Sequence, residues 1–318
     1  MSKKQKRLSV SQKLFFEGKD FFKKYENKTT QNCYVRNFKR FIQYCREFHK
    51  VQNLSDCKAH IQNYINYLVE VKGMTPSTVH TYITPASLYF NTCLDEYSKP
   101  KRCTADYTRG RSYNGRIEHS GNHMDNPRYQ RLVSFQREVG LRRAELKRLK
   151  GADLILDEFG YYSIRVKSKG GRIQTQRILN PEYIKPYFEG KAPDEKIFHS
   201  KEFSNTLNLH AARAECARNA YQYYVERLKN EGDTYRRQLE AEVRERLRAV
   251  IDKKTGKPKR IKEKYLHGKY FCRGKNKLLC QKLGIPWVYD KLSVMAVSVF
   301  HLAHNRPGVT VESYLTAR

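Results

Sequence analysis

Apolar side chains recur at helical spacing through the first third of the chain. Tyr34, Phe38, Phe41, Ile42 and Cys45 follow one another at intervals of one, three or four residues, which places them on one face of a helix. Comparable apolar stretches predict three further helices, at 14–22, 61–68 and 79–89. Four short helices in succession predict a compact helical bundle over residues 8 to 97.

Polar residues and helix breakers predict where these helices begin and end. Thr29 or Thr30 is the expected N-cap of the second helix, because a hydroxyl can accept a hydrogen bond from a free backbone N–H group. Gly73 is the expected stop of the third helix. Pro76 is expected in the first turn of the fourth, where a missing N–H group costs nothing, and Leu88 is expected on the apolar side of that helix.

The second half of the chain mixes helical and strand periods. A helix is predicted over 129–139, ending in a turn at Gly140, and another helix starts at Leu141. Three short β-strands are predicted at 153–156, 161–166 and 172–179, and the chain then returns to helix. This order predicts an α+β fold, mostly α with a small antiparallel β-sheet at one edge.

A basic segment separates the bundle from this second domain. Residues 98–126 are rich in Gly, Asn and Ser, and positions 99 to 116 hold six lysines and arginines against one acid. The composition predicts a linker that lies along phosphates, with a plain spacer as the alternative. The candidate phosphate contacts are Lys99, Arg102, Arg109 and Arg111. The expected domains are therefore 1–97, the linker 98–126, and 127–318.

The charge of the chain points to a polyanionic partner. The 318 residues carry a formal net charge of +31, spread over the whole length, and the apolar share of 39% is enough for one large or two ordinary cores. Such a balance is typical of proteins that bind nucleic acid. Charge alone does not separate an enzyme from a ribosomal or other RNA-coating protein, or from a solvated basic surface.

The cysteines and the N-terminal residues narrow the possible classes of protein further. The eight cysteines include no Cys-x-x-Cys pair, so neither a zinc ribbon nor a redox motif is predicted. A metal site could be assembled only from residues whose spacing fits no standard pattern, namely His267, Cys272, Cys280 and His301. The basic start lacks a secretory apolar core and no stretch is long enough to span a membrane, which predicts a soluble cytoplasmic protein.

The candidate nucleophile lies near the C-terminus. Tyr314 follows His304 by ten residues, after a predicted helix over 294–302. A phenol beside histidine and arginine can attack a phosphodiester and hold the cut strand covalently. His301 lies one turn before His304 and is expected simply to pack.

Three upstream segments supply the other groups that such an attack needs. Arg142 follows Gly140 at a predicted helix start, where a guanidinium can fork across two phosphate oxygens, and Glu145 is expected to hold it in place. His210 and Arg213 share one helical face, so one can accept a proton while the other binds the same phosphate. A hairpin turn between strands carries Lys169, a candidate acid, with Lys167 as a close competitor.

Taken together, these segments resemble the tyrosine recombinases, the family of phage integrases and chromosome-dimer resolvases. The resemblance covers most of the chain, and its five motifs occur in the family's order. The bundle is similar to the core-binding domain at Thr30, Tyr34, Phe38, Phe41, Ser77, Thr78 and Tyr82. The other motifs are the first arginine box at 140–146, the lysine hairpin at 168–171, the second box at 210–213, and the terminal box at 302–304 with Tyr314.

The resemblance implies a two-domain DNA clamp and a cut-and-rejoin chemistry. Arg142 and Arg213 would clamp the scissile phosphate, and His304 would hydrogen-bond it. Tyr314 would attack, leaving a 3′-phosphotyrosine and a free 5′-hydroxyl. Lys169 would act as the acid, and His210 would assist proton transfer. The implied cofactor requirement is none, since the phosphotyrosine conserves the bond energy and resealing needs neither ATP nor metal.

Several features depart from the family pattern. Ala303 replaces the usual glycine, which is expected to be mild on the assumption of a helix interior, and Ala214 replaces a histidine often found after the second arginine. The interval from Arg213 to His304 is far longer than usual. The extra stretch predicts an inserted basic helical arm at about 231–277 that adds phosphate contacts or touches a neighbouring protomer, with a plain solvated insertion as the alternative.

The resemblance also implies partners. They are double-stranded recombination sites and, on synapsed DNA, three further copies in a homo-tetramer, with a monomer or dimer when free and no membrane contact. Only four residues follow Tyr314, whereas many relatives pass a C-terminal helix to the next subunit. Either the inserted arm supplies that contact or DNA holds the assembly together.

We therefore expect a site-specific recombinase that integrates, excises or inverts a mobile element. A rival enzyme is a type IB topoisomerase, which uses similar chemistry to swivel one strand. The N-terminal bundle favours recombination. A rival of another class is a non-enzymatic basic protein that coats DNA or RNA.

Overall fold

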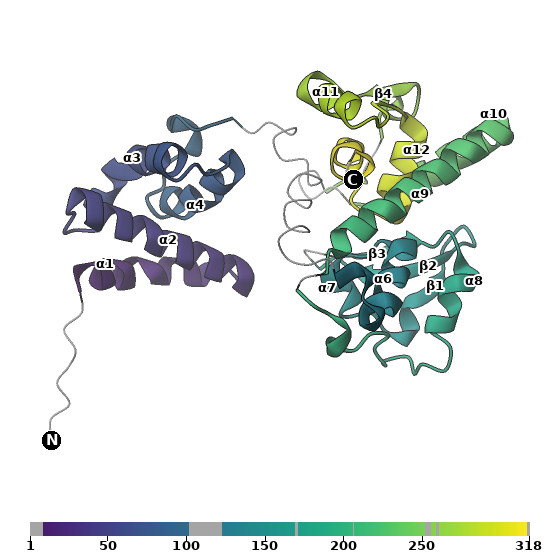
Figure 1. Cartoon of the computed structure of the whole chain (residues 1–318), viewed down its shortest axis with the longest axis horizontal. Coiled ribbons are helices and arrows are strands. Elements are labelled where there is room, and N and C mark those ends of the chain that lie inside the picture. The colour runs from purple at the N-terminus through teal and green to yellow at the C-terminus, as the bar shows by residue number, and fades with distance from the viewer. Residues whose placement is uncertain are drawn as a thin grey trace. The chain divides into compact units, whose positions relative to one another are not determined.

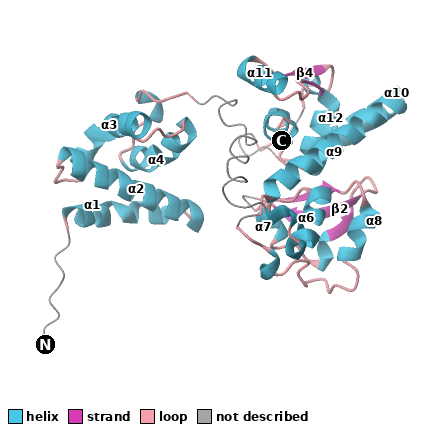
Figure 2. Ribbon diagram, in the orientation of Figure 1, coloured by secondary structure: helices cyan, strands magenta, loops and turns pink. Residues whose placement is uncertain are grey.

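The chain folds into two compact units, Met1–Cys103 and Thr104–Arg318. The computed structural model describes residues 9–101, 123–168, 171–205, 207–251, 256–258 and 261–316. Helices dominate both units, and the strands belong to small antiparallel sheets in the C-terminal unit (Figures 1 and 2). The predicted fold class, mostly α with a small antiparallel sheet and an N-terminal helical bundle, is confirmed.

The N-terminal unit is a helical bundle around an aromatic core. Its main helices are α1 (Val10–Lys19), α2 (Lys28–His49), α3 (Ile61–Asn66) and α4 (Pro76–Tyr89), joined by short 3₁₀ helices at Asp20–Lys24, Ser55–His60 and Leu94–Glu96 and a π turn at Tyr67–Val71. Phe22, Phe38 and Phe41 are fully buried, and the rings of Phe22 and Phe38 meet edge to face. The four predicted helical stretches are present.

Two local predictions in this bundle are wrong. The N-cap of α2 is Asn27, whose side chain accepts from the Thr30 N–H group at 3.1 Å, so the helix begins earlier than a cap at Thr29 or Thr30 would allow. Asparagine caps at least as well as threonine, and the pattern did not separate them. Leu88 is exposed rather than on the packed side of α4, because Val79 and Ile83 supply that face.

The C-terminal unit combines helices with two small sheets. Its helices are α6 (Pro127–Val139), α7 (Arg143–Leu146), α8 (Pro181–Ile184), α9 (Leu209–Asn230), α10 (Gly232–Arg248), α11 (Gly274–Lys282), α12 (Lys291–Ala296) and α13 (Pro307–Thr310). The strands are β1 (Leu154–Leu156), β2 (Tyr162–Lys167), β3 (Ile173–Arg177), β4 (Lys269–Phe271) and β5 (Val288–Asp290). Two π turns, Val297–His301 and Val311–Leu315, extend α12 and α13.

The predicted three-stranded sheet is present, and a second sheet was missed. Strands β1, β2 and β3 pair antiparallel in sequence order, with Ile164 opposite Leu154 on one side and Gln176 on the other. Strands β4 and β5 form an antiparallel pair in a stretch that the sequence predicted as helix. Each has only three residues, too few for an alternating pattern to be recognised.

Helix α10 belongs to the core of the C-terminal unit. Its side chains Tyr235, Leu239, Val243 and Leu247 are buried and pack in one cluster with residues of α9, α12 and the two π turns. The stretch 231–277, predicted as an inserted arm, therefore contributes one amphipathic helix to the interior of the domain.

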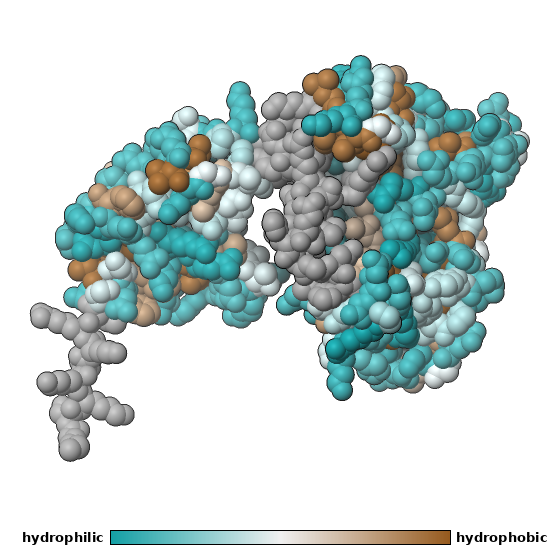
Figure 3. All heavy atoms as spheres, viewed as in Figure 1, coloured by the Kyte–Doolittle hydropathy of each residue, from teal (hydrophilic) through white to brown (hydrophobic). Residues whose placement is uncertain are grey.

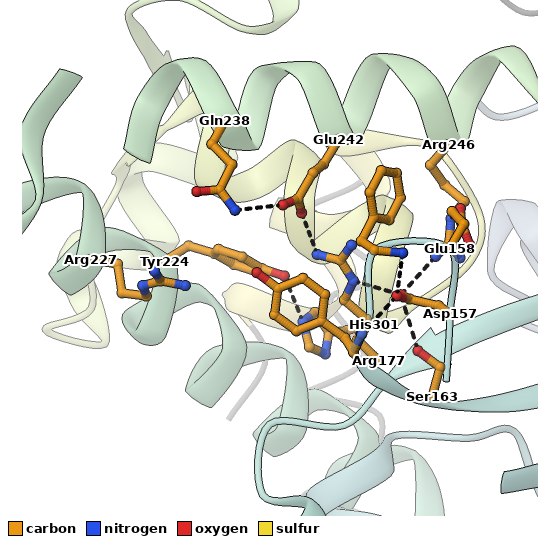
Figure 4. A network of polar contacts seen from close by, with 12 residues as sticks. Asp157, Glu158, Ser163, Arg177, Tyr224, Arg227, Gln238, Glu242, Arg246 and His301 are labelled. Carbon is orange, nitrogen blue, oxygen red and sulfur yellow. Dashed lines mark hydrogen bonds and ion pairs between the residues drawn. The ribbon is translucent and has the colours of Figure 1, made fainter. Parts of the chain in front are cut away.

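A buried ion-pair network ties α10 to the three-stranded sheet (Figure 4). Arg177 donates through Nε to Asp157 at 2.9 Å and through Nη1 to Glu242 at 2.7 Å, and Arg246 donates to Asp157 at 3.0 Å. The pKa of Asp157 is lowered overall. Burial acts to raise it, but the hydrogen bonds from Arg177 and from two backbone N–H groups have the larger effect. Removing one member would leave buried charge uncompensated and would therefore be strongly destabilising.

The surface is strongly hydrophilic, in keeping with the net charge (Figure 3). Apolar side chains nevertheless lie exposed on the second small sheet and α11, where Phe271 is 50% and Leu278 65% exposed. None of the helices among the described residues is both long and apolar enough to cross a bilayer.

Candidate active site

The site begins at the junction between α6 and α7. Gly140 ends α6 in the left-handed region, with φ +61°, where glycine carries no steric penalty. A Cβ atom here would lie 2.9 Å from the Cys216 sulfur of α9. Glycine is therefore needed both for the turn and for the close approach of α9 to this turn.

Arg142 and Glu145 form the contact that the sequence predicted. The Glu145 carboxylate accepts from the backbone N–H of Arg142 at 2.7 Å and from its guanidinium at 2.6 Å. The Glu145 side chain is buried, whereas the Arg142 side chain stays 34% exposed. Glu145 thus fixes one side of the guanidinium and leaves the other side open. Ser168, the residue before Lys169, also donates to Glu145, at 3.4 Å.

Arg213 occupies the centre of the site, and only 1% of its surface is exposed. One terminal nitrogen donates to the carbonyl oxygen of Gly140, and the other donates to that of Leu302 at 2.7 Å. The remaining nitrogen, Nε, is buried with no hydrogen-bond partner among the described residues. A buried guanidinium with one unused donor is suited to an anionic ligand.

His304 is held in a tight turn by Ser298. The Ser298 carbonyl accepts from the backbone N–H groups of His304 and Asn305, and its hydroxyl accepts from that of Arg306 at 2.8 Å. Ser298 comes from the π turn at Val297–His301, a kind of helical distortion that is frequent at functional sites.

The same contacts decide which ring nitrogen of His304 carries the hydrogen. The Arg306 N–H group donates to Nδ1 at 3.3 Å, and the Ser298 hydroxyl lies 3.3 Å from the same atom. In a neutral ring the hydrogen then belongs on Nε2, an atom that is buried without a partner in the described residues. Burial and the charges of Arg213, Arg306 and Arg142 lower the pKa of His304 to about 3. At neutral pH the ring therefore offers an uncharged N–H donor.

Tyr314 lies against these groups from the π turn at Val311–Leu315. Its ring centre is 5.1 Å from that of His210, 5.7 Å from that of His304, and 5.6 Å from the Arg213 guanidinium carbon. Only 5% of the residue is exposed. Of the 23 tyrosines in the chain, the one predicted from its distance to His304 is indeed packed against histidine and arginine.

The structure brings together five of the six predicted catalytic residues. These are Arg142, His210, Arg213, His304 and Tyr314, contributed by the α7 junction, α9 and the C-terminal turns. Lys169 lies outside the described residues. Its competitor Lys167 ends β2 with an exposed side chain, and its carbonyl accepts from Arg148 at 2.7 Å.

The predicted phosphate contacts of the linker are mostly beyond what the structure describes. Arg102, Arg109 and Arg111 lie outside the described residues. Lys99 is described, and its amine donates to Asp95 at 2.8 Å and to the carbonyl of Leu94. An ion pair on the surface of the N-terminal unit thus already engages Lys99.

The residues considered for a metal site are not gathered into one. His301 hydrogen-bonds the Tyr224 hydroxyl at 3.0 Å, while His267 pairs with Glu263 at 3.0 Å on the surface. Across the described ranges, no group of three or more His, Cys, Asp or Glu side chains is placed to hold a metal ion. His301 packs in the core, as its position one turn before His304 predicted.

Buried His301 makes stability depend on acid. Burial and the nearby charge of Arg177 lower its pKa to about 3, against about 6.5 in an unfolded chain. Between these values the unfolded state binds a proton that the folded state does not, so the free energy of unfolding falls as pH falls. We expect His301→Gln to reduce the slope between pH 6.5 and 4.5 by about 1 kcal/mol per pH unit, measured by urea unfolding.

A matched control comes from an exposed histidine. His199→Gln should leave that slope unchanged, since the His199 side chain is solvent-exposed. Asp157 does not affect the comparison of the two slopes, because its lowered pKa confines its contribution to the pH dependence of unfolding to more acidic solutions. An unaltered slope in His301→Gln would contradict the assignment.

The expectation for Ala303 was wrong in its reason. Ala303 does not lie inside a helix but follows the π turn at φ +48°, in the left-handed region that glycine favours. We therefore predict that Ala303→Gly raises the free energy of unfolding by up to about 1 kcal/mol, after the entropy that glycine adds to the unfolded chain. Urea unfolding of the two proteins tests this, and a destabilised variant would show that the buried methyl group matters more than the backbone strain.

Two contributors to the site were not found from the sequence. Ser298 acts through hydrogen bonds to a turn six residues away, and no periodic pattern marks it. Asn208 lines the pocket beside Arg142, His210 and Arg213. An asparagine two residues before His210 is a recognisable N-cap signal, and it could have been noticed in the sequence.

A comparison with known families places the N-terminal unit. Residues 16–99 match the family described as the phage integrase N-terminal SAM-like domain. Over these residues the N-terminal unit is similar to phage-integrase SAM-like domains. The predicted resemblance to the tyrosine recombinase and phage integrase family is therefore confirmed over these residues.

Two solved recombinase structures align with part of this chain. The XerH site-specific recombinase bound to a palindromic difH substrate, in a post-cleavage complex, is 16% identical with a TM-score of 0.43, covering 68% of this integrase-like chain and 75% of XerH. The XerA recombinase is 16% identical with a TM-score of 0.23, covering 67% and 85% respectively. No curated protein sequence matches the chain significantly.

Proposed function

We propose that this protein is a site-specific recombinase that cuts and rejoins DNA through Tyr314. The carrying observation is the pair of buried donors beside that phenol, Arg213 Nε and His304 Nε2, neither of which has a partner among the described residues. Burying a donor without a partner is costly, so both atoms fit a site that awaits an acceptor. A backbone phosphate of DNA supplies charged acceptor oxygens.

The charge around these donors supports the same ligand. Arg142 keeps a third of its side chain exposed near the buried Arg213, and the Glu145 carboxylate pairs with Arg142. Burial lowers the pKa of Arg213 and the nearby charge of Arg142 lowers it further, while the Tyr314 phenol, which the guanidinium contacts, raises it. A phosphate between the two guanidinium groups would relieve their repulsion and stabilise the charge that develops during phosphoryl transfer.

In the proposed reaction the Tyr314 oxygen attacks the scissile phosphorus. A new bond from oxygen to phosphorus forms, and the bond from phosphorus to the 5′-oxygen breaks. The result is a 3′-phosphotyrosine and a 5′-hydroxyl. His210 helps to remove the phenol proton, and Lys169 gives a proton to the departing oxygen. Rejoining reverses these steps with a 5′-hydroxyl as nucleophile, so the phosphoester energy is conserved and neither ATP nor metal is required.

Access to Tyr314 requires a local movement. Only 5% of the residue is exposed, and its ring packs against His210 and His304. We propose that DNA binding shifts the turn at Val311–Leu315, so that the phenol oxygen faces the phosphate held by Arg142 and Arg213.

The other predicted parts keep their place in this proposal. The SAM-like unit and the basic segment 98–126 would hold the duplex, and residues 231–277 would add phosphate contacts. The active assembly would be a homo-tetramer on two synapsed recombination sites, in the cytoplasm and associated with the nucleoid. Integration, excision and inversion of a mobile element are all compatible outcomes of this chemistry.

Covalent trapping tests the proposed function directly. A duplex carrying a nick beside the cleavage site lets the short fragment diffuse away after attack, so that the protein stays attached. We expect a protein–DNA adduct that survives denaturation, with the DNA attached to the peptide containing Tyr314 in mass spectrometry. An adduct on another residue, or none on the ends of the protein's own element, would contradict the proposal.

A further inference from the structure

Asn208 stands at the first turn of α9, directly before the helix that carries His210 and Arg213. Its side-chain oxygen accepts from the Ala211 N–H group at 3.1 Å and so caps the helix. Because this bond fixes which end of the amide is oxygen, it also fixes the position of the amide nitrogen. The orientation of the Asn208 side chain is thus set by the fold.

The amide nitrogen of Asn208 is an unused donor in a buried position. Only 8% of the residue is exposed, and Nδ2 is buried without a hydrogen-bond partner among the described residues. An –NH₂ group carries two donors, and leaving them unpaired inside a protein is unfavourable. The helix cap gives the side-chain oxygen a hydrogen-bond partner but leaves the side-chain nitrogen without one.

The pocket that Asn208 lines carries positive charge. This pocket, of about 320 Å³, is also lined by Arg142, Arg143, His210 and Arg213, and no carboxylate is among its lining residues. Asn208 is therefore next to the two guanidinium groups that would hold the phosphate. The first backbone N–H groups of the 22-residue helix α9 point out of the same end, which further favours an anion.

We infer that the Asn208 amide donates a hydrogen bond to the DNA phosphate that Arg142 and Arg213 clamp. This inference rests on the DNA-cleaving function proposed above and adds a neutral donor to its charged groups. A phosphodiester oxygen is the acceptor that this position lacks, and a donor held by a helix cap needs no rearrangement when charge develops on that oxygen.

Asn208→Ser separates the donor from the cap. Serine caps helices about as well as asparagine, so the variant keeps the bond to the Ala211 N–H group and loses the –NH₂ group. Thermal unfolding should therefore be unchanged, while DNA binding should weaken about tenfold.

Asn208→Asp keeps the size and the cap but places negative charge against the phosphate, and it should bind more weakly still. Asn180→Ser removes the corresponding amide from the N-cap of α8, outside this pocket, and should bind DNA as the parent does.

Replacing one DNA phosphate at a time by an uncharged analogue identifies which phosphate Asn208 contacts. A duplex that the protein selects from a random-sequence pool is prepared with one methylphosphonate at a time, and binding is measured in a Tyr314→Phe background so that no strand is cut. We expect one methylphosphonate position at which Asn208→Ser no longer weakens DNA binding. At this same position Arg142→Ala should also no longer weaken binding.

The outcomes are distinct. A shared position supports the inference. Parental affinity in Asn208→Ser, an effect that persists at every position, or an effect that vanishes at a phosphate unrelated to Arg142 would overturn it. If the parent protein formed no covalent adduct but Asn208→Ser and Arg142→Ala still shared one phosphate position, only the proposed cleavage chemistry would be contradicted. If no DNA were selected from the pool, both the cleavage function and the Asn208 contact would be contradicted.

Discussion

Tyr314→Phe should bind DNA with the affinity of the parent protein and form no covalent adduct. The substitution removes only the phenol oxygen, which is the atom proposed to attack phosphorus. The tilted ring contacts with His210 and His304 can be made by a phenylalanine ring and should be preserved. The expected effect on cleavage is therefore complete loss rather than a reduced rate.

The measurement combines a nicked duplex with denaturing electrophoresis. The parent should show a slower-migrating protein–DNA species, and Tyr314→Phe should show none even after long incubation. Tyr289→Phe is the matched control, since Tyr289 is a buried tyrosine of the same core whose hydroxyl donates to the Pro286 carbonyl at 2.6 Å. An adduct that persists in Tyr314→Phe would move the nucleophile to another residue.

The candidate site residues could be predicted because the proposed chemistry restricts their residue types. A tyrosine ten residues after a histidine, and an arginine one turn after another histidine, keep their spacing wherever the chain folds. What the sequence could not provide is the environment of each group. That Arg213 is fully buried, with two nitrogens on the carbonyls of Gly140 and Leu302, depends on segments about 70 and 90 residues away.

The same reason separates the predicted elements from the missed ones. Helix α6 and the strands β2 and β3 have enough residues to show a period, and Gly140 ends α6 where expected. The pair of β4 and β5 is held by contacts between distant segments, so neither strand is recognisable alone.

Long-range charge pairs explain what the composition of 231–277 could not predict. Its many arginines and glutamates are residues that are mostly exposed, so they gave no sign that part of this stretch is buried. In the folded domain Glu242 and Arg246 of α10 instead meet Asp157 and Arg177 in a buried network (Figure 4). Sequence composition does not reveal which charges find partners, and only the partners make burial possible.

Arg213→Lys should lower the rate of strand cleavage by about 10²–10³-fold while keeping the positive charge. The guanidinium binds two carbonyl groups and still presents Nε to the phosphate. A lysine ammonium is a single point of donation on a flexible stem, so it cannot hold both carbonyls and the phosphate in this geometry. One carbonyl left without its donor should also cost about 1–3 kcal/mol of stability.

Single-turnover cleavage at saturating protein separates the chemical step from weaker DNA binding, and urea unfolding measures the stability change. Arg137→Lys is the matched control, because Arg137 pairs with Glu215 at 3.1 Å on a partly exposed surface. Such a pair contributes little, so this variant should cleave and unfold like the parent. If Arg213→Lys cleaved within a few-fold of the parent, charge alone would suffice, and the buried fork of Arg213 would have no part in catalysis.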